Sequence, residues 1–274
     1  MSMILSALLA FFLGSYVGKF MGFTVHFLPQ ILLEDCEKGR LPRDIFKSYF
    51  KEPFCWHCKH PLKRTDQLPL IGYFLQKGTC RQCGKPIESK VIWLEWGIAL
   101  LFGLSALVFP FNFSLLFVLF ATCLLICCII TDYEYGILPD QFTLLLLWMG
   151  LLGSLFPVFI APREAILGAI AGYGFFWVIN LIYYYFRNIE GMFPGDFKIN
   201  AAIGALVGLK LLFPILLISL LLVIVVALVK VYLSPKLTDT GHFITEYLHK
   251  EIAYGCLVSL VAIVSLFLLL AGFL

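Results

Sequence analysis

The sequence predicts an all-α polytopic membrane protein with about eight transmembrane helices and one small polar loop domain between the first two. Hydrophobic residues make up 61% of the 274 residues and charged residues only 14%, whereas soluble proteins contain about half apolar and a quarter charged residues. The apolar residues are gathered in runs long enough to cross a bilayer. The formal net charge of +3 is small and scattered, which argues against nucleic acid as a partner.

The predicted spans rest on apolar runs of about 17 to 25 residues. The stretch 199–232 is interrupted by Lys210 and Pro214, which predicts a tight hairpin of two short helices rather than one long helix. The first run has no basic residue before Lys19 and continues past any small-residue cleavage site, so we expect an anchor and not a removable signal. The runs are residues 3–27, 92–110, 113–131, 141–160, 164–186, 199–213, 215–232 and 252–273.

One polar region sets the expected domain organisation. Residues 1–27 form the first transmembrane helix, 28–90 a loop domain and 91–274 the transmembrane core. The loop region carries 12 of the 20 Lys and Arg residues, and cytoplasmic loops are the ones that carry such an excess. Threading eight spans from a cytoplasmic loop places both chain ends outside and leaves only Arg163 and Lys210 facing outward.

Two aspartates stand at span borders that this topology places on the cytoplasmic side. Asp132, in "IITDYEYGILPDQF", lies where the third span ends, and Asp196, in "GMFPGDFKIN", lies where the sixth begins. An ionisable residue at the edge of the hydrocarbon is costly and indicates a functional site. Two neighbouring carboxylates do not both ionise easily, so one keeps a proton while the other acts as a base. Such a pair can activate water and protonate a leaving amine.

Helix capping is the structural alternative for these acids. Asp196 and Asp140 both precede helical patterns, where an aspartate is a good N-cap. For Asp140 we favour the cap. Asp132 ends a helix, where its charge opposes the helix dipole, so capping does not explain it and a functional role is favoured. Gly195 would let a backbone come close to Asp196, although Pro and Gly are also common in plain turns between helices.

The loop region contains a second constellation, "CWHC" at 55–58 and "CRQC" at 80–83. Four thiolates in two such pairs match a tetrahedral Zn²⁺ site, formed by Cys55, Cys58, Cys80 and Cys83. A cytoplasmic setting disfavours structural disulfides, and a dithiol redox pair is the main alternative. The metal is expected to be structural, because so small a domain lacks a sufficient core of its own.

These residues resemble the bacterial type IV prepilin peptidases. The similar segments are "LGSYVGKFMGFTVHFLP" at the first span, the cysteine segment "CWHCKHPLKRTDQLPLIGYFLQKGTCRQCGKPI", and the two aspartate blocks "TDYEYGILPDQFTLLLLWMGLL" and "EGMFPGDFKINAAIGALVG". The resemblance implies that Asp132 and Asp196 are catalytic and that the four cysteines bind zinc. The chain departs from the family at Phe193, where a glycine is usual, and at "IAYGC", 252–256, where the family has "PFGP".

The resemblance also implies a function. A protein of this family in the bacterial inner membrane would cut a short basic leader, after a glycine and at the cytoplasmic face, from prepilins and pseudopilins whose hydrophobic N-terminal helix lies in the lipid bilayer. It would then methylate the new terminal amine with S-adenosylmethionine. No glycine-rich nucleotide fingerprint supports the methyl transfer from the sequence itself.

Two other classes of function compete with this one. A proton-coupled transporter would also place acids in its spans, but no internal repeat of broken helices is visible. An inactive assembly factor of the same fold would keep the cysteines while tolerating loss of either aspartate.

Overall fold

The computed structural model describes residues 3–37, 54–55, 57–58, 60–63, 65–156, 160–188, 191–233 and 254–273. The chain divides into two compact units, Met1–Leu115 and Leu116–Leu274. Within the described residues every regular element is a helix, and the only β-type pairing is two isolated bridges, Phe54 with Pro61 and Thr79 with Pro86. The predicted all-α fold class is therefore confirmed.

Five helices in the described part of the chain are long and apolar enough to cross a membrane. They are α1 (Met3–Glu37), α4 (Ser89–Val108), α5 (Phe113–Tyr135), α7 (Pro162–Arg187) and α8 (Pro194–Leu233). Two shorter apolar helices, α6 (Asp140–Gly153) and α10 (Tyr254–Leu270), have 14 and 17 residues. The protein is thus a multi-pass membrane protein, whereas the predicted number of eight crossings is not confirmed.

In the first unit, glycines bring α1 and α4 into close contact. A Cβ at Gly14 would lie 2.8 Å from the Cβ of Phe102, and one at Gly18 would lie 3.0 Å from the Cα of Glu95. These glycines are four residues apart, so they lie on one face of the helix. Small residues at this spacing are typical of helix contacts in membranes, where close backbone approach replaces the hydrophobic driving force. Helix α1 continues past its predicted end at residue 27 to Glu37.

A polar segment connects these two helices. We call the described residues between 54 and 88 the cysteine loop, and its only helix is the short α3 (Ile71–Leu75). Glycines with positive φ shape its turns, among them Gly78 (φ 68°) and Gly84 (φ 69°). Residues 38–53, which belong to the predicted loop domain, lie outside the described part of the chain.

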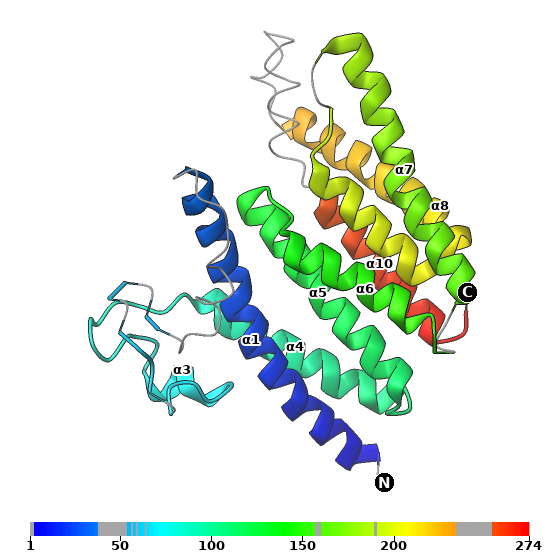
Figure 1. Cartoon of the computed structure of the whole chain (residues 1–274). Helices are drawn as coiled ribbons and strands as arrows, with labels where there is room; N and C mark the ends of the chain where they lie inside the picture. The colour runs from blue at the N-terminus through cyan, green and yellow to red at the C-terminus, as the bar shows by residue number, and fades with distance from the viewer. Residues whose placement is uncertain are drawn as a thin grey trace. The chain divides into compact units, whose positions relative to one another are not determined.

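In the second unit, α8 is the central helix and contacts α6, α7 and α10. Its closest approach is to α7, where Gly168 and Gly204 face each other so tightly that a Cβ on either would overlap the other's carbonyl. Gly172 meets the backbone of Asn200 in the same way. Figure 1 shows α7 and α8 running alongside each other.

Helix α8 is interrupted, but not where the sequence predicted. The break lies at Gly208, whose φ of 77° and ψ of 172° are not helical, and not at Lys210 and Pro214. Figure 1 shows the parts before and after this point running in different directions. Glycine adopts a positive φ at no steric cost, whereas Pro214 lies inside the helical segment that follows the break. The backbone therefore turns at the glycine.

Candidate functional site

Asp132 lies near the C-terminal end of α5 and reaches the start of α10. Its Oδ2 accepts a hydrogen bond of 2.8 Å from the backbone N–H of Cys256, in the first turn of α10. The first N–H groups of a helix have no partner within it, and they attract negative charge. The half-buried carboxylate thus also caps α10, a structural role that the sequence argument missed because the two residues are 124 positions apart.

Asp196 lies in the first turn of α8, and its side chain is also half-buried. Its backbone N–H donates to the carbonyl of Phe193 over 3.0 Å. Helix α8 begins at Pro194, so Asp196 is inside the first turn and not at the N-cap position that the sequence suggested. A carboxylate at this position still faces the positive end of the helix dipole.

The segments that carry the two aspartates meet at Leu138. A Cβ at Gly195 would lie 3.0 Å from the Cβ of Leu138, and a Cβ at Gly255 would lie 2.8 Å from its Cδ1. The same Cβ at Gly255 would lie 3.0 Å from Oδ2 of Asp132. Neither glycine can be enlarged without moving Leu138. The structure thereby brings together the end of α5, the start of α8 and the start of α10.

A chain of two hydrogen bonds also links α8 to α10. The Tyr254 hydroxyl donates to Oδ1 of Asn200 over 3.1 Å, and Nδ2 of Asn200 donates to the backbone carbonyl of Asp196 over 2.7 Å. Asn200 is fully buried. Sequence reasoning missed both residues, although an asparagine one turn after Asp196 in an otherwise apolar segment was a signal that could have found them.

The loop before Asp196 is tied to α7. Oδ1 of Asn180 accepts hydrogen bonds from the backbone N–H groups of Gly191 and Met192, at 2.9 and 3.1 Å. Phe193, where the family usually has glycine, is 61% exposed. The phenylalanine therefore fits without displacing the loop.

Asp140 does not cap α6 as the sequence predicted. The N-cap position belongs to Pro139, and no side chain caps this helix. Asp140 instead pairs with Lys198, with 2.6 Å between Nζ and Oδ1. The pair joins α6 to α8 over 58 positions of sequence. A local capping pattern cannot reveal a partner so far away in the chain.

The four predicted cysteines come together in the cysteine loop. Their sulfur atoms all lie within 4.8 Å of one another, and the Cys55–Cys83 and Cys58–Cys80 sulfur pairs are each 3.9 Å apart. A tetrahedral zinc site with Zn–S bonds of about 2.3 Å has sulfur separations of about 3.8 Å. The arrangement fits a four-thiolate metal site, and the sulfurs are too far apart for disulfides.

Backbone hydrogen bonds prepare one of these thiols to bind a cation. Those from Cys83 and Gln82 outweigh desolvation and lower the pKa of Cys80 to about 6. At Cys58 a backbone hydrogen bond from His60 also favours the thiolate, but desolvation and the neighbouring cysteines raise its pKa to about 11. Without a metal, the cluster therefore holds its first negative charge on Cys80.

Comparisons with known proteins cover all six predicted site residues. The chain matches the sequence model of the type IV leader peptidase family over residues 118–228, and that of the bacterial peptidase A24 N-terminal domain over residues 12–109. Proteins called prepilin leader peptidase/N-methyltransferase are similar to most of it. The one from Aeromonas hydrophila is 32% identical over 77% of this chain and 76% of its own. The one from Burkholderia pseudomallei (strain 1026b) is 35% identical over 77% and 72%, and the one from Neisseria gonorrhoeae 31% over 81% of both. No solved structure matches the chain.

Proposed function

Because this chain belongs to the type IV leader peptidase family, we propose that it is a membrane-embedded aspartyl endopeptidase that removes the leader peptide of prepilins and pseudopilins and then N-methylates the new terminal residue. The observation that carries the peptidase half is the meeting of three segments at Leu138. Two of them bear Asp132 and Asp196, and the third begins at Tyr254.

Asp132 and Asp196 are the catalytic pair in this proposal. One carboxylate takes a proton from a water molecule, whose oxygen attacks the scissile carbonyl carbon. The other carboxyl, protonated because two close carboxylates do not both ionise easily, gives its proton to the leaving amine. The C–N bond breaks, one product gains a carboxylate, and the other gains the free terminal amine. The backbone N–H of Cys256 holds Oδ2 of Asp132 from the side of α10.

The substrate is inferred from the family and from charge. We propose a short basic leader that is cut after a glycine, followed by a hydrophobic helix lying in the lipid bilayer. The cleavage site would lie at the cytoplasmic face of the bacterial inner membrane, because the loop region 28–90 carries 12 of the 20 basic residues. Labelling of single cysteines that replace His60, Arg187 or Pro162 tests this placement. We expect the first two positions on the cytoplasmic side and the third outside. Labelling of position 60 from the outer side would overturn the placement.

We assign the four cysteines to a structural Zn²⁺. Cys55, Cys58, Cys80 and Cys83 close a tetrahedral shell without other ligands. The domain organisation proposed is a first transmembrane helix over 1–27, a zinc-binding loop domain over 28–90 and a peptidase core over 91–274. Metal analysis of purified protein should find about one zinc per chain. A metal-free protein that stays fully folded would overturn this assignment.

One experiment tests both activities. The purified protein in lipid nanodiscs is incubated with a prepilin and S-adenosylmethionine, and the products are weighed by mass spectrometry. We expect a cleaved pilin and a second species heavier by one methyl group. Asp132→Asn and Asp196→Asn should each nearly abolish the cleaved species, while Asp140→Asn, which removes only an exposed ion pair, should change the rate little. Normal cleavage by Asp196→Asn would refute the catalytic assignment.

The other two classes of function are not favoured. The curated relatives are enzymes by name, and they cover most of this chain. An inactive assembly factor would tolerate either aspartate substitution, and a transporter would move protons or solutes across liposomes. The aspartate variants and a liposome assay therefore separate these classes from the peptidase.

A further inference from the structure

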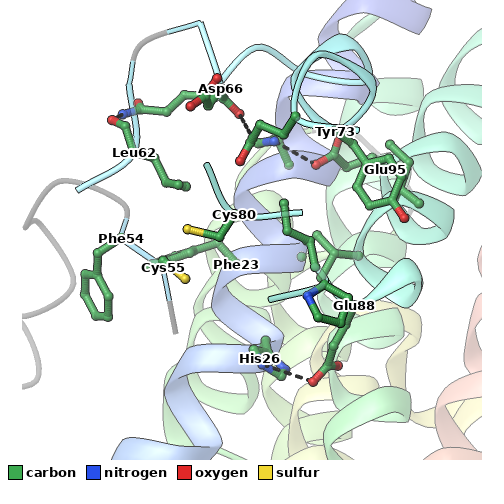
Figure 2. Close-up of a pocket in the computed structure, with 18 of the residues that line it drawn as sticks. Phe23, His26, Phe54, Cys55, Leu62, Asp66, Tyr73, Cys80, Glu88 and Glu95 are labelled. Atoms are coloured by element: carbon green, nitrogen blue, oxygen red, sulfur yellow. Dashed lines mark hydrogen bonds and ion pairs between the residues drawn. The ribbon is translucent and has the colours of Figure 1, made fainter. Parts of the chain in front are cut away.

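A cavity of about 760 Å³ lies within the first unit, between α1, α4 and the cysteine loop. Its size is in the range of small-molecule sites. Figure 2 shows side chains from all three walls turned toward it. The α4 wall consists of Glu88, just before the helix, with Val91, Ile92 and Glu95. These positions follow the spacing of one helix face, so both carboxylates lie on the same side.

The cavity wall carries charges of both signs. Its acids are Asp66, Glu88 and Glu95, and its lysines are Lys19 and Lys85. Glu95 is only 2% exposed, and its Oε1 lies 3.2 Å from Nζ of Lys19. Asp66 is also buried, and it pairs with an arginine of the loop over 3.0 Å. Buried charges of this kind are costly unless partners hold them in place.

Glu88 is the accessible acid of the cavity, with 52% of its side chain exposed. In Figure 2 it faces His26 of α1, 3.7 Å away, and Nζ of Lys90 lies 2.9 Å from its other oxygen. Partial burial would raise the pKa of Glu88, but Lys90 and His26 outweigh it and lower that pKa overall. The carboxylate is therefore ionised at neutral pH.

The cysteine loop contains a strained turn between two residues of the cavity wall, Gln67 and Tyr73. Leu70 has a φ of 61° and a ψ of −46°, and Ile71 N–H donates to the Pro69 carbonyl over 2.6 Å, which makes a tight γ-turn. The Leu70 N–H donates to Oε2 of Glu95 over 2.9 Å. Strained conformations of this kind persist where the surroundings hold them, and they cluster at ligand sites. Glu95 thus fixes the turn to the α4 wall.

Gln76 supplies an unused acceptor in the same wall. Gln76 is 6% exposed, and its Nε2 donates to the backbone carbonyls of Asp66 and Gly72 at 3.3 and 3.2 Å. Its Oε1 is buried and has no hydrogen-bond partner among the described residues. A buried acceptor without a partner costs free energy, so such an atom calls for a donor.

We propose that this cavity binds the methyl donor, S-adenosylmethionine, an inference that rests on the N-methyltransferase half of the proposed function. The molecule is a sulfonium zwitterion with an adenosyl group. Its sulfonium matches the accessible carboxylate of Glu88, its own carboxylate matches Lys85, and its amino and hydroxyl groups can donate to Gln76. Aromatic residues of the wall, among them Phe23 and Tyr73, offer faces for the adenine and the sulfonium.

The same features argue against the basic leader peptide as the occupant. A leader rich in lysine and arginine would bind best to a wall with only negative charges, whereas this wall also carries the positive charges of Lys19 and Lys85. When bound, the donor supplies a methyl group that leaves the sulfur and bonds to the terminal amine nitrogen. The sulfur keeps the bonding electron pair and becomes a neutral thioether, and the amine releases one proton to water.

Binding of two ligands tests this site without any turnover. The full-length zinc-loaded protein in nanodiscs is titrated calorimetrically with S-adenosylmethionine and with S-adenosylhomocysteine, which lacks the methyl group and its positive charge. Glu88→Gln should weaken binding of the charged ligand about tenfold and of the neutral one far less. Gln76→Leu should weaken both about equally, because the two ligands share every hydrogen-bond donor. Glu164→Gln, an equal change of charge in the second unit, should alter neither affinity.

The outcomes separate the site from the function. Equal losses for both ligands in Glu88→Gln, or unchanged affinities in both cavity variants, would overturn the site while the wild type still methylates. A basic leader peptide whose binding depends on Glu88, beside methyl-donor binding that does not, would also overturn it. A wild type that neither binds the methyl donor nor yields a methylated product would instead overturn the methyltransferase function itself.

Discussion

The hydrogen bond from Tyr254 to Asn200 offers a direct test of how the aspartate region is held together. Tyr254→Phe removes the hydroxyl that donates to Oδ1 of Asn200 over 3.1 Å. Asn200 is 0% exposed, so water cannot replace the lost donor. An unsatisfied buried acceptor lowers the free energy of unfolding by about 1–3 kcal/mol. Tyr254→Phe should therefore unfold at lower temperature than the wild type.

The same substitution should slow leader cleavage. Asn200 also donates to the carbonyl of Asp196, and the first turn of α10 holds Asp132. Loss of the hydrogen bond between α8 and α10 should therefore make the positions of both aspartates less well fixed. We expect kcat to fall about tenfold, corresponding to about 1.4 kcal/mol, with a smaller change in KM because Tyr254 acts through Asn200 and not on the substrate.

A double substitution separates this explanation from a simple loss of packing. Asn200→Leu together with Tyr254→Phe removes both polar partners, and replacing a buried hydrogen-bonded pair by apolar groups of similar shape is nearly neutral. The double variant should thus be at least as stable as Tyr254→Phe alone, with a coupling of about 1 kcal/mol or more in a double-mutant cycle. Thermal unfolding in nanodiscs provides the measurement. Tyr185→Phe, whose side chain is 80% exposed, is the matched control. Strictly additive losses would refute the reasoning.

Three further predictions follow from the aspartate region and the cysteine cluster. Asp132→Asn and Asp196→Asn combined should cleave no more slowly than either alone in a steady-state assay, because the two carboxyls act as one unit; multiplied losses would contradict a pair. Gly255→Ala should abolish cleavage, because its Cβ would lie 3.0 Å from Oδ2 of Asp132, whereas Gly174→Ala, with no atom within 4 Å, should leave the rate unchanged. Cys80→Ser should release the zinc and unfold the cysteine loop before the membrane core, because one of the four sulfurs of the shell is lost; metal analysis and hydrogen exchange would measure this, and a variant that keeps both its zinc and a protected loop would contradict the assignment.

The sequence was sufficient for features that depend on composition and short spacing. Apolar runs predicted a helical membrane protein because a bilayer requires every backbone polar group to be bonded within its own segment. The paired cysteines predicted a metal site because residues three apart on a tight turn already present two sulfurs to one point, and two such turns complete the shell. Asp132 and Asp196 were found because a carboxylate at the edge of an apolar run is costly.

Contacts between distant segments were decided only by the tertiary structure. The break in α8 lies at Gly208 and not at Pro214, because glycine readily adopts the φ of 77° required there, whereas Pro214 lies inside the helical segment that follows. Asp140 pairs with Lys198 where a local pattern predicted a cap, since an opposite charge from another helix replaces the capping bond. Asp132 meets Cys256, and Asn200 meets Tyr254, across 124 and 54 positions. Short-range patterns record what each residue prefers near its own backbone, whereas these partners are chosen by how the helices pack.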